Sequence, residues 1–104
     1  MRERGLKVDR LDVEAVADRM TGWSVSGGDR DALAKSFVFA DFKTAWAFMS
    51  GCALKAEQLD HHPEWFNVYN RVDVTLTTHD AGGVTKLDEA LGAFMDDLAG
   101  AFSA

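Results

Sequence analysis

The sequence predicts an α+β fold of two layers, in which a four-stranded antiparallel sheet is covered on one face by three helices. Three amphipathic segments and four short runs rich in β-branched and aromatic residues follow one another in the order α-β-β-α-β-β-α. One layer of sheet and one of helix is the simplest way to bury one face of every element in this pattern. The chain has 104 residues, so we expect residues 1–104 to form a single domain, with 1–8 frayed.

The first part of the chain is predicted to form one short helix and a β-hairpin. Asp12 is a suitable N-cap for a helix over 12–21, whose apolar residues recur at helical spacing. Apolar and polar residues alternate over 23–26 and again over 33–40, and residues 27–32 between them are rich in glycine and aspartate. We therefore expect two antiparallel strands joined by an exposed loop.

A long central helix is predicted over 42–59, with Asp41 as its N-cap. Its core-facing stripe is predicted from the apolar residues that recur every three or four positions: Phe42, Ala45, Trp46, Met49, Cys52, Ala53 and Ala56. Phe48 and Leu59 lie off this stripe. The excess of apolar residues predicts a second buried face, in contact with another subunit or partner, although Phe48 could also fold over the edge of the core.

A second hairpin is predicted after the central helix. Pro63 cannot lie inside a helix, so the helix must end before it. Two runs rich in β-branched and aromatic residues follow, 65–69 and 72–78. Only Asn70-Arg71 separates them, which predicts a tight turn between two antiparallel strands.

A last helix is predicted over 86–102, after a flexible loop at 80–83. Thr85 is placed to cap it, and Asp88, three residues later, can reach back to the cap in a capping box. Its apolar residues form one stripe, which we expect to face the core: Leu87, Leu91, Phe94, Met95, Leu98 and Phe102.

The composition excludes several classes of protein and site. The net charge of −6 at pH 7 makes the chain a poor general binder of nucleic acid, which requires clustered Lys and Arg. No apolar run approaches the roughly 20 residues that a membrane span needs. Cys52 is the only cysteine, so an intrachain disulfide and a cysteine-based zinc site are excluded. We expect a cytoplasmic protein with no nucleic-acid or membrane partner.

All three histidines of the chain are predicted to meet at one rim of the sheet. A two-residue turn that pairs Tyr69 with Val72 places His62 opposite His79, and His61 is adjacent in sequence. Histidine is the side chain whose charge changes most readily near neutral pH. Three imidazoles at one rim bring no obvious packing benefit, so their convergence predicts a functional site.

Four carboxylates surround the same rim: Glu57, Asp60, Asp80 and Asp88. Each of these residues also has a purely structural explanation. A His-His-Pro segment can be a plain connection between helix and strand, and Asp88 can serve only as a cap for the last helix. The functional interpretation therefore depends on the clustering of these side chains rather than on any one of them.

Two kinds of chemistry fit this set of residues. Imidazoles can donate and accept protons at neutral pH without a metal. Three histidines can instead hold zinc with one open coordination position. Neighbours in an extended segment point to opposite sides, so the adjacent His61 and His62 argue against a shared metal ion. We expect no metal at this site.

The segment from Glu57 to Asn70, EQLDHHPEWFNVYN, together with His79 and Asp88, resembles the pterin-4a-carbinolamine dehydratases. The resemblance extends from about residue 22 to the end of the sequence. It implies the α+β fold and a reaction that removes water from a 4a-hydroxytetrahydropterin to give the quinonoid dihydropterin. It also implies that no cofactor is needed and that the reaction recycles the tetrahydropterin used in aromatic amino acid hydroxylation.

The resemblance further implies roles for the residues of the rim. His61 and His79 would form an acid–base pair that serves the two faces of the pterin ring, and His62 would bind and orient the ring. The groups implied to fix the imidazole tautomers or raise the pKa of the rings are Glu57, Asp60 and Asp88. The residues implied to bind the pterin are His61, His62, Pro63, Trp65, Thr78, His79, Asp80 and Ala81.

The apolar surplus of the central helix predicts contacts with other chains. We expect a homodimer or homotetramer formed through helix 42–59 and a sheet edge. The alternative function is a protein-interaction module, because some proteins of this kind resemble dimerisation cofactors or assembly factors. The face predicted for either contact contains Phe48, Met49, Cys52 and Lys55. The presence of all three histidines favours the enzyme.

Overall fold

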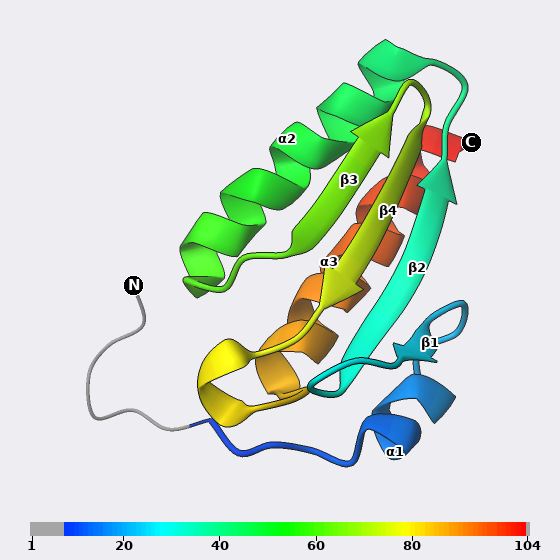
Figure 1. Ribbon diagram of the computed structural model, residues 1–104. Helices are drawn as coiled ribbons and strands as arrows, with labels where there is room; N and C mark the ends of the chain where they lie inside the picture. Colours follow the sequence, from blue (N-terminus) through cyan, green and yellow to red (C-terminus); the bar gives the residue numbers. More distant parts are fainter. Residues whose placement is uncertain (1–7, 104) are drawn as a thin grey trace.

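The computed structural model describes residues 8–103 and has the α+β fold that the sequence predicts (Figure 1). The elements in chain order are α1 (Val13–Asp18), β1 (Ser24–Ser26), β2 (Ala32–Val38), α2 (Phe42–Leu59), β3 (Glu64–Val68), β4 (Arg71–Leu76), the 3-10 helix η1 (His79–Ala81) and α3 (Lys86–Ser103). The bounds of α2 are those predicted, α1 is shorter, and η1 lies where a flexible loop was expected. The predicted fraying of 1–8 lies, except for Val8, outside the described residues.

The two hairpins pair through β2 and β4, which gives the sheet the order β1-β2-β4-β3. This central antiparallel pair aligns Leu33 with Leu76 and Val38 with Arg71. The loop that precedes β2 therefore lies next to the end of β4. That long-range pairing brings residues near position 30 to the candidate site, and the separate hairpin patterns in the sequence did not indicate it.

One face of the sheet packs against the helices and the other is open. In the view of Figure 1, α3 lies behind the sheet, and it packs against α2. The inward side chains of the central strands are fully or almost fully buried: Leu33, Phe37, Val72, Val74 and Leu76. None of the helices within residues 8–103 is both long and apolar enough to cross a membrane.

The prediction of which face of α2 is buried was partly wrong. Phe48 is fully buried, and its ring lies 4.9 Å from the rings of both Phe37 and Phe39. Phe42 and Trp46, which were expected in the core, are 48% and 57% exposed. Two apolar stripes overlap on this helix, and spacing alone does not choose between them. The aromatic side chains on the sheet decide the rotation, because the Phe48 ring packs between them.

The interaction face predicted around Phe48 and Cys52 is consequently wrong. Both side chains are fully buried in the core, and burial raises the pKa of the Cys52 thiol to about 12. The large exposed apolar side chains of α2 are instead Phe42, Trp46 and Leu54, of which Leu54 is 75% exposed, and Ala53, also expected in the core, is exposed.

The turn of the second hairpin lies one residue earlier than predicted. Val68 pairs with Arg71, so the turn is Tyr69-Asn70. Moving the turn by one residue moves each cross-strand partner by two, and every side chain keeps its face. Asn70 is fixed to the end of β2, since its side chain donates to the Phe39 carbonyl at 2.9 Å and its carbonyl accepts from the Phe39 N–H at 2.8 Å.

We predict that Phe48→Ala lowers the free energy of unfolding by about 3–5 kcal/mol, because it opens a cavity between α2 and the sheet. The same substitution at Phe42 is the matched control and is expected to cost about 1 kcal/mol or less, since half of that side chain is already in solvent. Urea unfolding followed by circular dichroism measures both. Equal losses would contradict this rotation of α2.

Candidate active site

The turn that ends α2 places His61 against the core. Asp60 adopts the left-handed conformation, with φ 50°. Its N–H donates to the Glu57 carbonyl at 3.1 Å, and the His61 N–H donates to the Ala56 carbonyl at 2.9 Å, which is the Schellman pattern. Glycine is the usual residue at such a position, and an aspartate there costs about 1 kcal/mol. Asp60 is also one of the residues that line the pocket formed beside His61.

His61 and Asp88 form a buried pair between α2 and α3. His61 is 4% exposed and Asp88 0%, and the His61 Nε2 lies 2.6 Å from the Asp88 Oδ1. A carboxylate only accepts hydrogen bonds, so Nε2 must carry the proton. In the neutral ring Nδ1 then has a lone pair, which makes it the nitrogen that can accept a proton from another molecule.

The second oxygen of Asp88 completes the predicted capping box. Its Oδ2 accepts from the Thr85 N–H at 2.9 Å, and the Thr85 Oγ1 accepts from the Leu87 N–H at 3.2 Å. The carboxylate of Asp88 thus both caps α3 and binds His61. The two interpretations that the sequence left open for Asp88, a cap and a group of the site, are compatible.

Thr78 supports the same carboxylate from the end of β4. It is 1% exposed, and its Oγ1 donates to the Asp88 Oδ2 at 2.7 Å. Its only hydroxyl hydrogen is used in that bond, so the Thr85 hydroxyl, 2.7 Å away, must donate to it. The side chain of Thr78 therefore binds Asp88 in the core, and the contribution expected from residues 78–81 to the pterin pocket was that of their backbone.

His62 is held in a different way, on the surface. Its Nε2 forms a hydrogen bond with the carboxylate of Glu57, in the last turn of α2. The side chains are 55% and 76% exposed. The hydrogen bond from His62, with the charge of that ring as a smaller contribution, lowers the pKa of Glu57. Glu57 thus orients an exposed imidazole at the mouth of the site.

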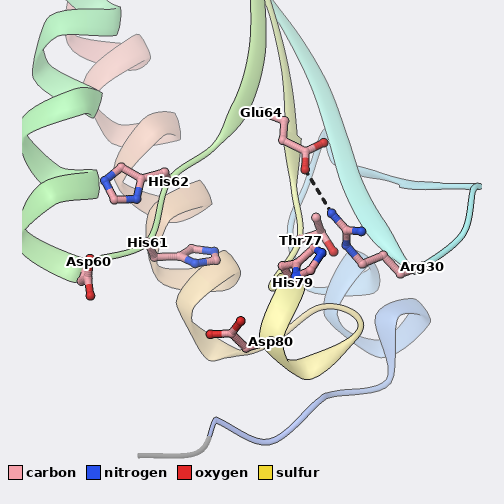
Figure 2. Close-up of a pocket in the computed structure, with 8 residues that line it drawn as sticks. All are labelled: Arg30, Asp60, His61, His62, Glu64, Thr77, His79 and Asp80. Atoms are coloured by element: carbon pink, nitrogen blue, oxygen red, sulfur yellow. Dashed lines mark hydrogen bonds and ion pairs between the residues drawn. The ribbon is translucent and has the colours of Figure 1, made fainter. Parts of the chain in front are cut away.

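His79 is the first residue of η1, in a short closed loop. The Thr78 N–H donates to the Gly83 carbonyl at 2.7 Å, which joins the two ends of the loop. Gly82 ends η1 with φ 74°, a conformation that suits glycine. This loop presents His79 on the side of the pocket that faces His61 (Figure 2).

The three histidines line one pocket of about 210 Å³ (Figure 2). Its full set of lining residues is Arg30, Asp60, His61, His62, Glu64, Thr77, His79 and Asp80. Four residues expected to bind the pterin are not among them: Pro63, Trp65, Thr78 and Ala81. Trp65 lies on the inward face of β3 and packs half-buried against the core.

Sequence reasoning missed Arg30, Glu64 and Thr77. The Thr77 Oγ1 donates to the Asp31 carbonyl at 2.8 Å, which fixes the loop before β2 to the end of β4. The Arg30 Nη2 donates to the Glu64 Oε2 at 3.2 Å and so closes one side of the pocket. The pairing of β2 with β4 is the signal that would have placed Arg30 near Thr77 and the pocket.

Within residues 8–103 the structure has no group of three or more His, Cys, Asp or Glu side chains placed to hold one metal ion. The ionisable side chains among the described residues that line the pocket are three imidazoles, three carboxylates and the guanidinium of Arg30.

Comparison with known proteins gives consistent matches along the chain. The family model for Pterin 4 alpha carbinolamine dehydratase matches residues 7–98. A protein of Sinorhizobium fredii (strain NBRC 101917 / NGR234), provisionally named pterin-4-alpha-carbinolamine dehydratase, is 54% identical over 97 residues, which are 90% of this chain and 91% of that protein. A protein of Bradyrhizobium sp. (strain BTAi1 / ATCC BAA-1182) with the same provisional name is 55% identical over 95 residues, covering 88% of this chain and 95% of the other.

Two solved structures are also similar. The crystal structure of a transcriptional coactivator/pterin dehydratase from Brucella melitensis has a TM-score of 0.83 and 49% identity, and the match covers 88% of this chain and 99% of that one. A pterin dehydratase-like protein, identified as a RuBisCO assembly factor in the alpha-carboxysome, has a TM-score of 0.65 and 28% identity, with coverage of 76% and 90%.

Proposed function

Because this chain belongs to the pterin-4α-carbinolamine dehydratase family, as its sequence predicts, we propose that it is a hydro-lyase acting on a 4a-hydroxytetrahydropterin. The observation that carries the proposal is the gathering of His61, His62 and His79 around one pocket. Imidazole both donates and accepts protons near neutral pH, which is what an elimination of water requires.

The proposed reaction removes water without oxidation or reduction. The bond between C4a and its hydroxyl oxygen breaks, and the oxygen takes up a proton so that it leaves as water rather than hydroxide. The lone pair of the neighbouring ring nitrogen, N5, forms the C4a=N5 double bond, and the proton on N5 is released. An imidazolium supplies the first proton and a neutral imidazole takes up the second, so the quinonoid dihydropterin forms with no cofactor.

The contacts of the three rings support different roles for them. His61 exchanges protons through Nδ1, because its Nε2 is bound to Asp88. His79 serves the opposite face of the pterin ring. His62, oriented by Glu57 at the mouth of the pocket, binds and aligns the ring. General acid–base catalysis of this kind contributes about 10²–10⁴-fold to the rate.

We place the reaction in the cytoplasm, in the recycling of the tetrahydropterin used for aromatic amino acid hydroxylation. The hydroxylated pterin would be the product of that hydroxylation. The quinonoid dihydropterin released here would then need a two-electron reduction to regenerate tetrahydropterin, which is chemistry for a separate reductase.

We predict that His79→Ala lowers the rate of dehydration by about 10²–10⁴-fold, because one of the two proton-exchanging groups is removed. His79 is exposed, so the variant should fold like the wild type. Dehydration of 4a-hydroxytetrahydropterin is followed by ultraviolet absorbance against a protein-free blank. His61→Ala is a poorer choice, since it leaves a buried Asp88 oxygen without its imidazole partner. Unchanged turnover by folded His79→Ala would contradict the assignment.

We also propose that the chain associates with copies of itself, as a dimer or tetramer, through the outward face of α2 and the free edge of β3. Phe42 and Trp46 stack with their ring centroids 6.3 Å apart on α2, and Leu54, about two turns further along the helix, is 75% exposed. β3 is the last strand of the sheet, so its outer edge has no neighbour among the described strands (Figure 1). The alternative occupant of the α2 face is a partner protein. One of the two similar structures is described as a coactivator and the other as an assembly factor, and these descriptions support the alternative.

Trp46→Glu should shift the protein toward monomer, because it places a charge in the apolar contact. Light scattering over a concentration series measures the mass. Val38→Glu is the matched control, since Val38 is 67% exposed on the open face of the sheet, and its mass should equal that of the wild type. A wild-type protein that is monomeric at every concentration would overturn self-association.

A further inference from the structure

We infer that Arg10, which does not line the histidine pocket, is a positioning residue for His79. It acts by holding the η1 loop, the segment of residues 78–83 that contains η1 and carries this histidine. The inference rests on the proposed function, and it gives the segment before α1 a part in the reaction.

The segment before α1 is bonded to the chain at the end of the η1 loop (Figure 1). The Leu11 N–H donates to the Val84 carbonyl at 2.8 Å. The neighbouring residue, Arg10, donates from its Nη1 to the Gly82 carbonyl at 3.3 Å. The chain before α1 is therefore fixed at two consecutive residues, and Arg10 makes its bond to the η1 loop itself.

The stem of the Arg10 side chain lies against Gly83. A Cβ at Gly83 would come 2.7 Å from the Arg10 Cδ and 3.2 Å from its Cγ, so no side chain fits there unless Arg10 moves. Gly83 is buried, its carbonyl accepts from the Thr78 N–H at 2.7 Å, and its N–H donates to the Thr78 carbonyl at 3.3 Å. The residue that closes the η1 loop is thus covered by the same side chain whose guanidinium binds the Gly82 carbonyl.

The η1 loop gives His79 little support of its own. Within it, the Ala81 N–H donates to the Thr78 carbonyl and the Gly82 N–H to the His79 carbonyl, both at 3.1 Å. The hydrogen bonds of a 3-10 turn have poor geometry, and none of the three residues of η1 is buried. A proton-exchanging group must be placed precisely. Contacts from outside the loop, such as that of Arg10, therefore help to keep His79 in position at the pocket.

Arg19 provides a matched control. It too is exposed and lies near the start of the chain, and its Nε and Nη2 donate to the Glu89 carboxylate at 2.7 and 2.9 Å. That pair joins the end of α1 to α3, whereas Arg10 bonds to the η1 loop. Loss of the Arg19 guanidinium therefore shows what weaker anchoring of the N-terminal part of the chain does by itself.

The first test compares Arg10→Met with Arg19→Met in the dehydration of 4a-hydroxytetrahydropterin. Methionine retains an unbranched stem against Gly83 and lacks the guanidinium. Arg10→Met should lower kcat about fivefold, the size expected for one hydrogen bond, and change KM by less than about twofold, because His62 aligns the ring. Arg19→Met should leave both constants within about twofold of the wild type. A kcat for Arg10→Met equal to that of the wild type, or an equal loss from Arg19→Met, would overturn the inference.

A double-mutant cycle shows whether Arg10 acts through His79. In the His79→Ala background, assayed at a higher protein concentration, Arg10→Met should cause no further loss of kcat, because the ring that Arg10 positions is absent. The same loss in both backgrounds would contradict this route.

Hydrogen exchange of the Gly82 N–H, which bonds to the His79 carbonyl, tests the same step without turnover. Arg10→Met should speed this exchange about fivefold and Arg19→Met by less than about twofold, because the η1 loop is released in the first variant and not in the second. Unchanged exchange in Arg10→Met would overturn the inference. If the wild type dehydrates no pterin, the proposed function fails, and this exchange alone decides whether Arg10 holds the loop. It also decides if His79→Ala shows no turnover above the protein-free blank.

Discussion

The buried carboxylate of Asp88 is the interaction on which both the fold and the site depend. Its two oxygens receive hydrogen bonds from His61 after α2, from Thr78 after β4 and from the backbone of Thr85 at the start of α3. A buried carboxylate is costly unless such bonds satisfy it. The ends of two helices and a central strand must therefore meet at this point, and the meeting of these ends fixes an imidazole at the wall of a pocket.

The site combines this inner wall with two exposed histidines, His62 and His79, each of which is held by a different interaction. His61 is positioned from the core, whereas His62 is oriented by Glu57 on α2 and His79 by the closed loop around η1. Arg30 is positioned at the pocket in a fourth way, by the pairing of β2 with β4. Groups that exchange protons with a substrate need both precise placement and access. For the proposed proton exchange, burying one ring and exposing the others meets both needs.

Local patterns in the sequence predicted the elements well, and long-range contacts account for the errors. The bounds of α2 and the capping box of Thr85 and Asp88 followed from cap residues, and the histidines met because adjacent strands form a hairpin. The rotation of α2 depended on how Phe48 fits the aromatic side chains of the sheet. Arg30 entered the pocket through a pairing of strands far apart in sequence, which no local signal encodes.

The most direct test of the account is the tautomer of His61, read from the ¹⁵N chemical shifts of its ring nitrogens in the folded protein. At a pH where the ring is neutral, hydrogen bonding to Asp88 requires the proton on Nε2 rather than on Nδ1. Asp88→Asn should weaken this preference. A neutral His61 with its proton on Nδ1 would contradict the central role given to Asp88.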